Sequence, residues 1–283
     1  MNLTDLSCVR DIMQRHGIAP QKRYGQNFLI NPTVVARIAD TCADREAGVI
    51  EIGPGIGTLT RELSPRFRKV VALEIDTSLI TVLGETLGDL DNVKVINADA
   101  MKTDLAALVK EEFDGMPVYV CANLPYYITS PIVMSLLESG GIFEAVTVMI
   151  QKEVADRFCA GAGSADYGAI TLAVNYYSEV EKCFNVAPGN FMPPPKVTSS
   201  VIRMNIRKEP PVSVRDSENM FRIIKYAFAC RRKTLVNALC TSSPKCGKEE
   251  VIRTLEKLGY DPNIRGERLA LSDYARISDE LTV

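Results

Sequence analysis

Short apolar runs alternate with helical patterns through the first two-thirds of the 283-residue chain, and this alternation most constrains the fold. Five runs are mostly apolar and rich in Val and Ile, as buried strands are. They lie at 49–52, 70–73, 93–96, 118–122 and 146–150. Helices are expected near 33–43, 58–67, 77–87, 104–113, 130–139 and 152–160. Such an alternation predicts an α/β fold with a parallel, doubly wound sheet.

A change of pattern near residue 210 predicts a second domain. After a further helical stretch around 168–177, two segments, 180–186 and 197–206, could pair as an antiparallel hairpin at the edge of the sheet. The run Lys208-Glu209-Pro210-Pro211 then ends the strand patterns, and from about 216 apolar residues recur at helical spacing. We therefore predict an α/β domain over 1–209 and a small all-helical domain over 210–283.

The distribution of charge points to a polyanionic partner more than the net charge does. The formal net charge is −2, but residues 201–283 hold 16 Lys and Arg against 11 Asp and Glu, and residues 1–200 hold 17 against 24. A basic C-terminal quarter on an acidic body is compatible with nucleic-acid binding. Solvated helix faces explain the same counts equally well.

Histidine and cysteine usage excludes several kinds of site. His16 is the only histidine, and the eight cysteines include no Cys-x-x-Cys pair, so neither a zinc site nor a His-based triad is expected. We predict no metal. The first residues carry no apolar signal core, and no run approaches the roughly 18 apolar residues of a membrane span. We expect a cytoplasmic protein with no membrane partner.

The sequence Glu-Ile-Gly-Pro-Gly-Ile-Gly-Thr at 51–58 ends the first strand and opens a helix. Glycines at such a turn let the backbone approach a ligand closely. The dinucleotide pattern G-x-G-x-x-G fails because Thr58 stands where its last glycine would be. A nucleoside ligand without a pyrophosphate fits the pattern better, although a tight turn alone would also require glycine.

Two acidic residues follow the next two strands. Glu74 ends the second strand, where a carboxylate can accept both hydroxyls of a ribose. Asp99 follows the third strand and could accept a hydrogen bond from an adenine amino group. Each could instead cap the helix that follows it. Their position on successive strand ends, at the edge where open α/β sheets bind ligands, favours a nucleoside site.

The fourth strand ends in Asn123-Leu124-Pro125-Tyr126. The Asn123 side-chain oxygen and the Leu124 carbonyl can both accept hydrogen bonds from one exocyclic amino group, and Tyr126 can stack on the attached ring. Two such acceptors would help aim the lone pair of adenine N6 at a sulfonium methyl group, and no strong general base would be needed. The stacking requires the ring of Tyr126 rather than its hydroxyl. Tyr127 is expected to be ordinary packing.

Together these segments resemble the ribosomal RNA adenine N6-dimethyltransferase family. The matching segments, in chain order, are YGQNFL (24–29), EIGPGIGTLT (51–60), LEID, NADA, NLPY (123–126), FMPPPKV (191–197) with Ser199 and Ser200, RRKTL (231–235) and, more weakly, RGERL (265–269). The resemblance implies a Rossmann-like, seven-stranded class I methyltransferase domain with a small C-terminal helical domain. It also implies methyl transfer from S-adenosylmethionine to N6 of two adjacent adenosines, in a hairpin loop near the 3′ end of small-subunit (16S) ribosomal RNA, during ribosome assembly.

The resemblance also implies roles for individual residues. Tyr126 and Phe191 would sandwich the target adenine, while Asn123 and the Leu124 carbonyl would hold its N6. The residues that would contact S-adenosylmethionine are Asn27, Leu29, Gly53, Glu74, Asp99 and Asn123. The residues expected to bind RNA are Lys22, Arg23, Arg222, Lys225, Arg231, Arg232 and Lys233. The expected partner is small-subunit RNA within an immature 30S particle, and the chain is expected to be a monomer.

Three other functions are compatible with parts of the sequence. A large-subunit RNA methyltransferase that confers antibiotic resistance would share the NLPY core, but PPPKVTSSV and RRKTL match the small-subunit enzymes better. A DNA adenine methyltransferase is more distant, since no DNA-reading module is evident. A mainly non-enzymatic checkpoint in ribosome assembly would bind immature subunits through the helical domain.

Overall fold

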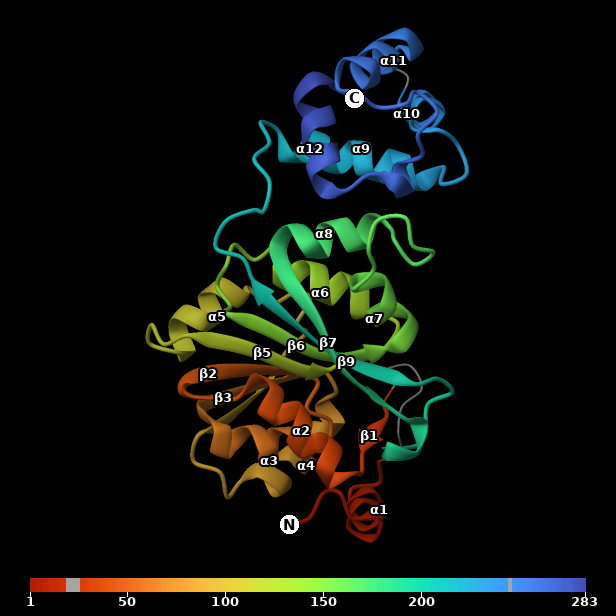
Figure 1. Ribbon diagram of the computed structural model, residues 1–283. Helices are drawn as coiled ribbons and strands as arrows, with labels where there is room; N and C mark the ends of the chain where they lie inside the picture. Colours follow the sequence, from red (N-terminus) through yellow and green to blue (C-terminus); the bar gives the residue numbers. More distant parts are fainter. Residues whose placement is uncertain (19–25, 244–245) are drawn as a thin grey trace. The chain divides into compact units, whose positions relative to one another are not determined.

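The computed structural model describes residues 1–18, 26–243 and 246–283, and their contacts divide the chain into two compact units (Figure 1). The sheet unit comprises Met1–Ala155 and Glu179–Ile206. The helical unit comprises Asp156–Ser178 and Arg207–Val283. The helical unit therefore includes a segment from the middle of the chain.

Seven strands form one mixed sheet in the order β4-β3-β2-β5-β6-β9-β7 (Figure 1). Their bounds are β2 Asp44–Ile52, β3 Phe67–Glu74, β4 Val93–Asn97, β5 Val118–Asn123, β6 Ala145–Gln151, β7 Ser178–Val186 and β9 Ser199–Ile206. Neighbours from β4 to β6 are parallel, and β9 runs antiparallel to β6. The predicted parallel core is confirmed, and the two late strands are neighbours at one edge as expected.

The connections place a topological switch point between β2 and β5. From β2 the chain proceeds outward to β3 and β4, and from β5 it proceeds to β6 on the other side. Figure 1 shows α2, α3 and α4 against one face of the sheet and α5 and α6 against the other. Their bounds are α2 Pro32–Cys42, α3 Thr58–Leu63, α4 Thr77–Leu87, α5 Leu105–Glu112 and α6 Thr129–Leu137. Ligands bind at such a switch point in open α/β sheets.

One helix is shorter than predicted. The helix expected over 58–67 ends at Leu63, and a 3₁₀ turn at Ser64–Arg66 leads directly into β3. Pro65 explains the early end, because proline has no backbone N–H to continue the α-helical hydrogen bonds.

Two short strands were not predicted from the sequence. β1 (Phe28–Leu29) pairs antiparallel with β8 (Phe191–Met192), with Leu29 opposite Phe191. Two-residue strands leave no periodic signal. The pair nevertheless joins two motifs that lie more than 160 residues apart in the sequence.

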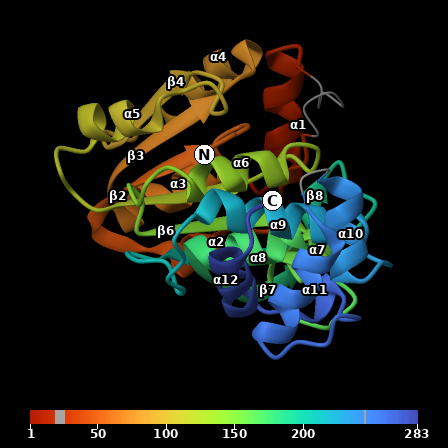
Figure 2. The ribbon, with the colours of Figure 1, turned by 90° about the horizontal axis from the view of Figure 1, so that it is seen from above.

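The N-terminal helix α1 (Leu6–Arg15) lies beside α4 (Figure 2). Val9 and Ile12 are buried in a cluster that includes Leu79 and Val82 of α4. Arg15 and His16 both contact Glu85, at 2.8 and 2.7 Å. This packing anchors the chain just before the pocket-lining segment that starts at Gln26.

Position 48 in β2 must be glycine, because the fully buried ring of Phe113 packs directly against its backbone. A Cβ atom at Gly48 would lie 2.1 Å from Cδ1 of that ring. The ring has no space to retreat into at interior packing density. Gly48 therefore allows the loop after α5 to cover the start of the buried part of β2.

We expect Gly48→Ala to lower the free energy of unfolding by about 3 kcal/mol, as overpacking of a dense core does. Gly84→Ala is the matched control, because Gly84 lies inside α4 and a Cβ there meets nothing within 4 Å. The control should raise stability by about 0.5–1 kcal/mol. Urea unfolding of both variants measures the difference, and equal effects would contradict the proposed role of Gly48.

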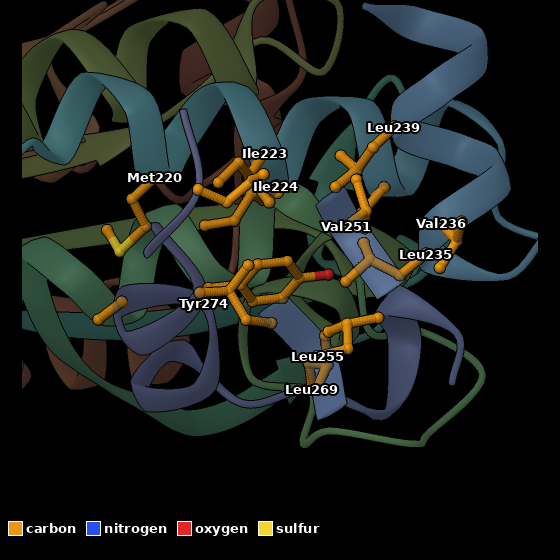
Figure 3. Packing of buried hydrophobic residues seen from close by; sticks show 14 of the residues in the cluster. Met220, Ile223, Ile224, Leu235, Val236, Leu239, Val251, Leu255, Leu269 and Tyr274 are labelled. Carbon is orange, nitrogen blue, oxygen red and sulfur yellow. The ribbon is translucent and has the colours of Figure 1, made fainter. Parts of the chain in front are cut away.

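The helical unit is built on a core of its own, around Tyr274 (Figure 3). Met220, Ile223 and Ile224 from α9 pack against it, as their helical spacing predicts. The helices are α7 Lys152–Phe158, which spans the division between the units, α8 Ala169–Tyr177, α9 Ser217–Ala229, α10 Leu235–Ser242, α11 Lys248–Lys257 and α12 Leu271–Glu280. Further 3₁₀ turns are Pro188–Asn190 and Gly266–Arg268. None of the helices in the described part of the chain is long and apolar enough to cross a membrane.

Candidate active site

A pocket opens at the carboxyl ends of β2, β3, β4 and β5, beside the switch point. It encloses about 1070 Å³, including its open mouth. The lining includes Asn27, Leu29, Gly53, Glu74, Asp99, Asn123, Leu124 and Tyr126. The structure thus brings together the six residues predicted for the cofactor and three of the four predicted for the target adenine.

The glycine-rich turn lies on the pocket wall. Gly53, Gly55 and Gly57 have φ values of +69°, +62° and +89°, in the left-handed region that favours glycine. A Cβ at Gly53 would meet nothing within 4 Å, while one at Gly55 would lie 3.1 Å from the Phe28 ring. The backbone at Gly53 is therefore open for close approach by a ligand.

Glu74 presents a buried carboxylate at the end of β3. It is 4% exposed and accepts hydrogen bonds from the backbone N–H groups of Asp76 (2.8 Å) and Gly55 (3.2 Å). Burial raises its pKa, and the amide bonds oppose that rise. Since two carboxylate oxygens offer about four acceptor positions, Glu74 keeps capacity for the two hydroxyls of a ribose.

The alternative that Glu74 and Asp99 only cap helices fails. Asp76 caps α4 by accepting from Ser78 N–H, and Asp104 caps α5 by accepting from Ala107 N–H. Asp99 instead accepts from the Met101 N–H (3.0 Å), and Lys102 lies 3.5 Å from its other oxygen. Both acids are thus available to the pocket.

Asn123 is held in one orientation by a neighbouring segment. Its Nδ2 donates to the carbonyl oxygen of Asn27 at 3.2 Å, which leaves Oδ1 as the acceptor end of the amide. The next residue is also held, because Leu124 N–H donates to the Met149 carbonyl at 3.1 Å. The strand end therefore presents an oriented amide followed by a backbone fixed against β6.

The two aromatic residues predicted for the target adenine differ in exposure. Tyr126 is partly buried at the pocket, and its hydroxyl lies 2.7 Å from Ser199 Oγ. Burial raises the pKa of Tyr126, and the bond to Ser199 opposes that rise. Phe191 is only 3% exposed and packs in a core cluster with Leu29. Within the described part of the chain, Phe191 is not among the pocket-lining residues.

A scan against known families matches residues 19–282 to the ribosomal RNA adenine dimethylase model. The chain belongs to this family. Among curated members, it is 45% identical over 276 residues to ribosomal RNA small subunit methyltransferase A of Geobacillus thermodenitrificans, covering 96% of this chain and 94% of that protein. It is 46% identical over 277 residues to the protein of the same name from Alkaliphilus metalliredigens, covering 97% and 96%.

Two solved structures share the fold of this chain. A dimethyladenosine transferase from Plasmodium falciparum matches with a TM-score of 0.73 and 26% identity, over 88% of this chain and 95% of that one. The 23S rRNA methyltransferase ErmE matches with a TM-score of 0.68 and 29% identity, over 90% and 99%. Membership of this family makes S-adenosylmethionine the methyl donor, and the open Gly53 backbone and buried Glu74 suit such a nucleoside.

Glu51 is a pocket residue to which the sequence analysis assigned no role. It ends up 1% exposed in β2, and its Oε2 has no hydrogen-bond partner among the described residues. Burial raises its pKa to about 8, with Glu74 adding to the rise and Thr60 opposing it. Its position as the only charged residue in an otherwise apolar strand end, Val49–Ile52, was the available signal.

Three apolar side chains at the pocket are unusually exposed. They are Ile75 (47%), Met101 (42%) and Tyr127 (58%). The expectation that Tyr127 is ordinary packing is therefore wrong, because more than half of its side chain is exposed at the pocket. Its ring follows Tyr126 in a turn outside regular structure, so no strand or helix directs it inward.

The residues predicted to bind RNA are distributed between the two ends of the chain. Lys22 and Arg23 lie outside the described residues. Arg222 and Lys225 are exposed on α9, and Arg231, Arg232 and Lys233 are exposed in the turn that follows it. The guanidinium of Arg231 is already engaged, donating to Glu267 (2.8 Å) and to the carbonyls of Ser164 (3.3 Å) and Ala165 (2.8 Å).

Proposed function

We propose that this protein transfers methyl groups from S-adenosylmethionine to N6 of two adjacent adenosines in small-subunit ribosomal RNA, giving N6,N6-dimethyladenosine. The observation that carries the proposal is the oriented amide of Asn123 in the pocket, next to Leu124 and Tyr126. The names and high coverage of the curated relatives support the small subunit as the substrate. An immature 30S particle in the cytoplasm is the proposed context, with the chain acting as a monomer.

The proposed mechanism relies on positioning and hydrogen bonding. S-adenosylmethionine supplies an electrophilic methyl group when bound. In the first transfer Asn123 Oδ1 and the Leu124 carbonyl accept the two N6 hydrogens, which draws the nitrogen lone pair out of conjugation with the ring. In the second transfer one of these two acceptors holds the single hydrogen that remains on N6. Tyr126 and Phe191 stack on the adenine, and Phe191 would have to uncover part of its buried ring to do so. The methylated nitrogen then loses its proton to water, so the site needs no strong base.

The remaining pocket residues are proposed to bind the donor. Glu74 accepts the ribose hydroxyls, Asp99 accepts from the adenine amino group, and the Gly53 backbone lies against the ligand. Asn27 and Leu29 complete this wall of the pocket. Glu51 is a further acid of the pocket lining, and burial raises its pKa to about 8, so its carboxyl holds a proton at neutral pH when no donor is bound.

We propose a different role for each of the two predicted domains. Residues 1–209 transfer the methyl group, and residues 210–283 bind RNA or the ribosomal particle. The exposed basic residues on and after α9 support the second assignment.

Methyl transfer from labelled donor to three substrates tests the proposal: under-methylated small subunits, naked small-subunit RNA and naked large-subunit RNA. Digestion to nucleosides should show N6,N6-dimethyladenosine in the small-subunit particles. Label confined to large-subunit RNA would assign the chain to the activity named for its structural relative ErmE. Donor binding without transfer to any substrate would favour a non-enzymatic role in ribosome assembly.

Neighbouring arginines should differ in their contribution to RNA binding. Arg232 is exposed and makes no hydrogen bond or ion pair with another described residue, so it is free to meet a phosphate. Arg232→Ala should reduce the slope of log affinity against log salt by about 1. Filter binding to small subunits over a range of salt concentrations measures the slope.

Arg231→Ala is the matched comparison, because its guanidinium holds the loop 161–166 instead. We expect faster hydrogen exchange at the Gly163 amide, which donates to the Glu267 carbonyl at 2.8 Å. Equal salt slopes for the two variants would mean that Arg231 also contacts RNA.

A further inference from the structure

Tyr126 lies in a segment whose backbone does little to aim its ring. Residues 124–128 form a turn between β5 and α6, and the Ile128 N–H bond to Pro125 (3.2 Å) closes that turn. No strand or helix includes Tyr126. Under the proposed function this ring must be held against a base, so something else has to fix its position.

The hydroxyl of Ser199 is the group that does so. Ser199 Oγ lies 2.7 Å from the Tyr126 hydroxyl, and either oxygen can donate. Ser199 is fully buried, and Tyr126 is partly buried beside it. Since the Tyr126 hydroxyl lies at the far end of its ring, on the axis of the Cβ–Cγ bond, a hydrogen bond there restricts rotation about χ1 and so holds the ring in place.

Ser199 itself belongs to rigid structure. It is the first residue of β9 and stands opposite Gln151 of β6, and the adjoining Lys152 N–H donates to the Thr198 carbonyl at 3.0 Å. The bond from Tyr126 therefore connects a turn at the pocket to the antiparallel part of the sheet.

We propose that Ser199 is a positioning residue for methyl transfer, acting by fixing the ring of Tyr126 at the pocket wall. This inference rests on the proposed function and deepens it. It also gives the tyrosine hydroxyl a purpose, whereas the sequence indicated a need for the ring alone. The ring supplies the stacking surface, and the hydrogen bond of the hydroxyl fixes where that surface lies at the pocket wall.

Methyl transfer requires the target base to be aligned with the methyl donor. A reacting group displaced by about 1 Å can lose about 10² in rate. Loss of one orienting hydrogen bond while the ring remains should cost less, about tenfold in kcat. Binding of S-adenosylmethionine should be unchanged, since Ser199 is not among the described residues that line the pocket.

The test compares Ser199→Ala, Tyr126→Phe and the double variant in methyl transfer to under-methylated small subunits. Each single variant should lower kcat about tenfold, with donor affinity measured by calorimetry unchanged. The double variant should be no slower than either single one, because both substitutions remove the same bond. Tyr126→Ala should be slower than all three, since it removes the stacking surface as well.

Ser200→Ala is the matched control for loss of a buried hydroxyl. Ser200 is also fully buried on β9, but its Oγ donates to Asn185 Oδ1 at 2.7 Å, away from the Tyr126 bond. The Ser200→Ala variant should be destabilised about as much as Ser199→Ala, but its kcat should equal that of wild type. The proposal is overturned if Ser199→Ala and Ser200→Ala have the same kcat, or if the effects of Ser199→Ala and Tyr126→Phe multiply in the double variant. A wild-type protein that binds donor but methylates no small subunit would instead overturn the proposed function.

Discussion

Replacing Asn123 with alanine should lower kcat about 10²–10³-fold, the usual cost of removing one oriented hydrogen-bonding group from a reacting centre. The side-chain oxygen is one of two proposed acceptors for the target N6, and the Leu124 carbonyl cannot replace it. The affinity for S-adenosylmethionine should fall much less. Single-turnover methyl transfer and calorimetric donor binding, measured on the same protein, separate the two effects.

Asn92→Ala provides the control for losing a structural amide. Asn92 Nδ2 donates to the carbonyls of Ser64 (2.8 Å) and Phe67 (3.1 Å), and Asn92 is not among the described residues that line the pocket. That variant should be less stable and equally fast per folded molecule. If Asn123→Ala loses donor affinity and turnover in equal proportion, its proposed role at N6 is wrong.

Glu51→Gln should change how stability depends on pH. In the folded protein burial raises the pKa of Glu51 to about 8, whereas its ordinary value is 4.5. Between these values the unfolded chain releases the proton and the folded chain keeps it, so wild-type stability falls as pH rises. Glutamine cannot titrate. The free energy of unfolding of Glu51→Gln, relative to that of wild type, should therefore rise by about 2–3 kcal/mol from pH 6 to pH 8, at roughly 1.36 kcal/mol per pH unit.

Urea unfolding of donor-free protein at pH 6, 7 and 8 measures this trend. Glu112→Gln is the control and should differ from wild type by a constant amount over this range, because hydrogen bonds from Lys94 and Lys69 lower the pKa of Glu112 and the carboxyl is ionised in the folded and unfolded chains at all three pH values. The stability that Glu112 adds is present above its unfolded pKa and is lost as pH falls through the lowered value. A constant difference between wild type and Glu51→Gln across this range would show that Glu51 is already ionised.

The main architecture was predictable because buried parallel strands leave continuous apolar runs. All seven strands of the sheet coincide with predicted segments, with ends shifted by a few residues. The β1–β8 pair was not predictable, because two-residue strands have no periodicity. Nor does sequence spacing show that Asp156–Ser178 packs with the C-terminal helices, since that assignment depends on tertiary contacts.

The site was predictable where residues end successive strands, since parallel strands bring their carboxyl ends together. Glu74, Asp99 and Asn123 meet in one pocket for this reason. The partners that orient them were not predictable. Asn27 holds the amide of Asn123 across 96 positions, and Ser199 bonds Tyr126 across 73. Such pairings arise only when distant segments fold side by side.

The mid-chain segment of the helical unit limits how this protein can exchange parts with its relatives by recombination. Tyr167 donates to the Leu269 carbonyl at 2.8 Å, and the Tyr176 ring meets that of Phe221 at 5.1 Å. A gene crossover near codon 210 falls between the two predicted domains. It would nevertheless take the segments 156–178 and 207–283, which pack against each other, from different parents. Substitutions in 156–178 and 207–283 should be inherited together, and a functional chimera would have to carry both segments from the same parent.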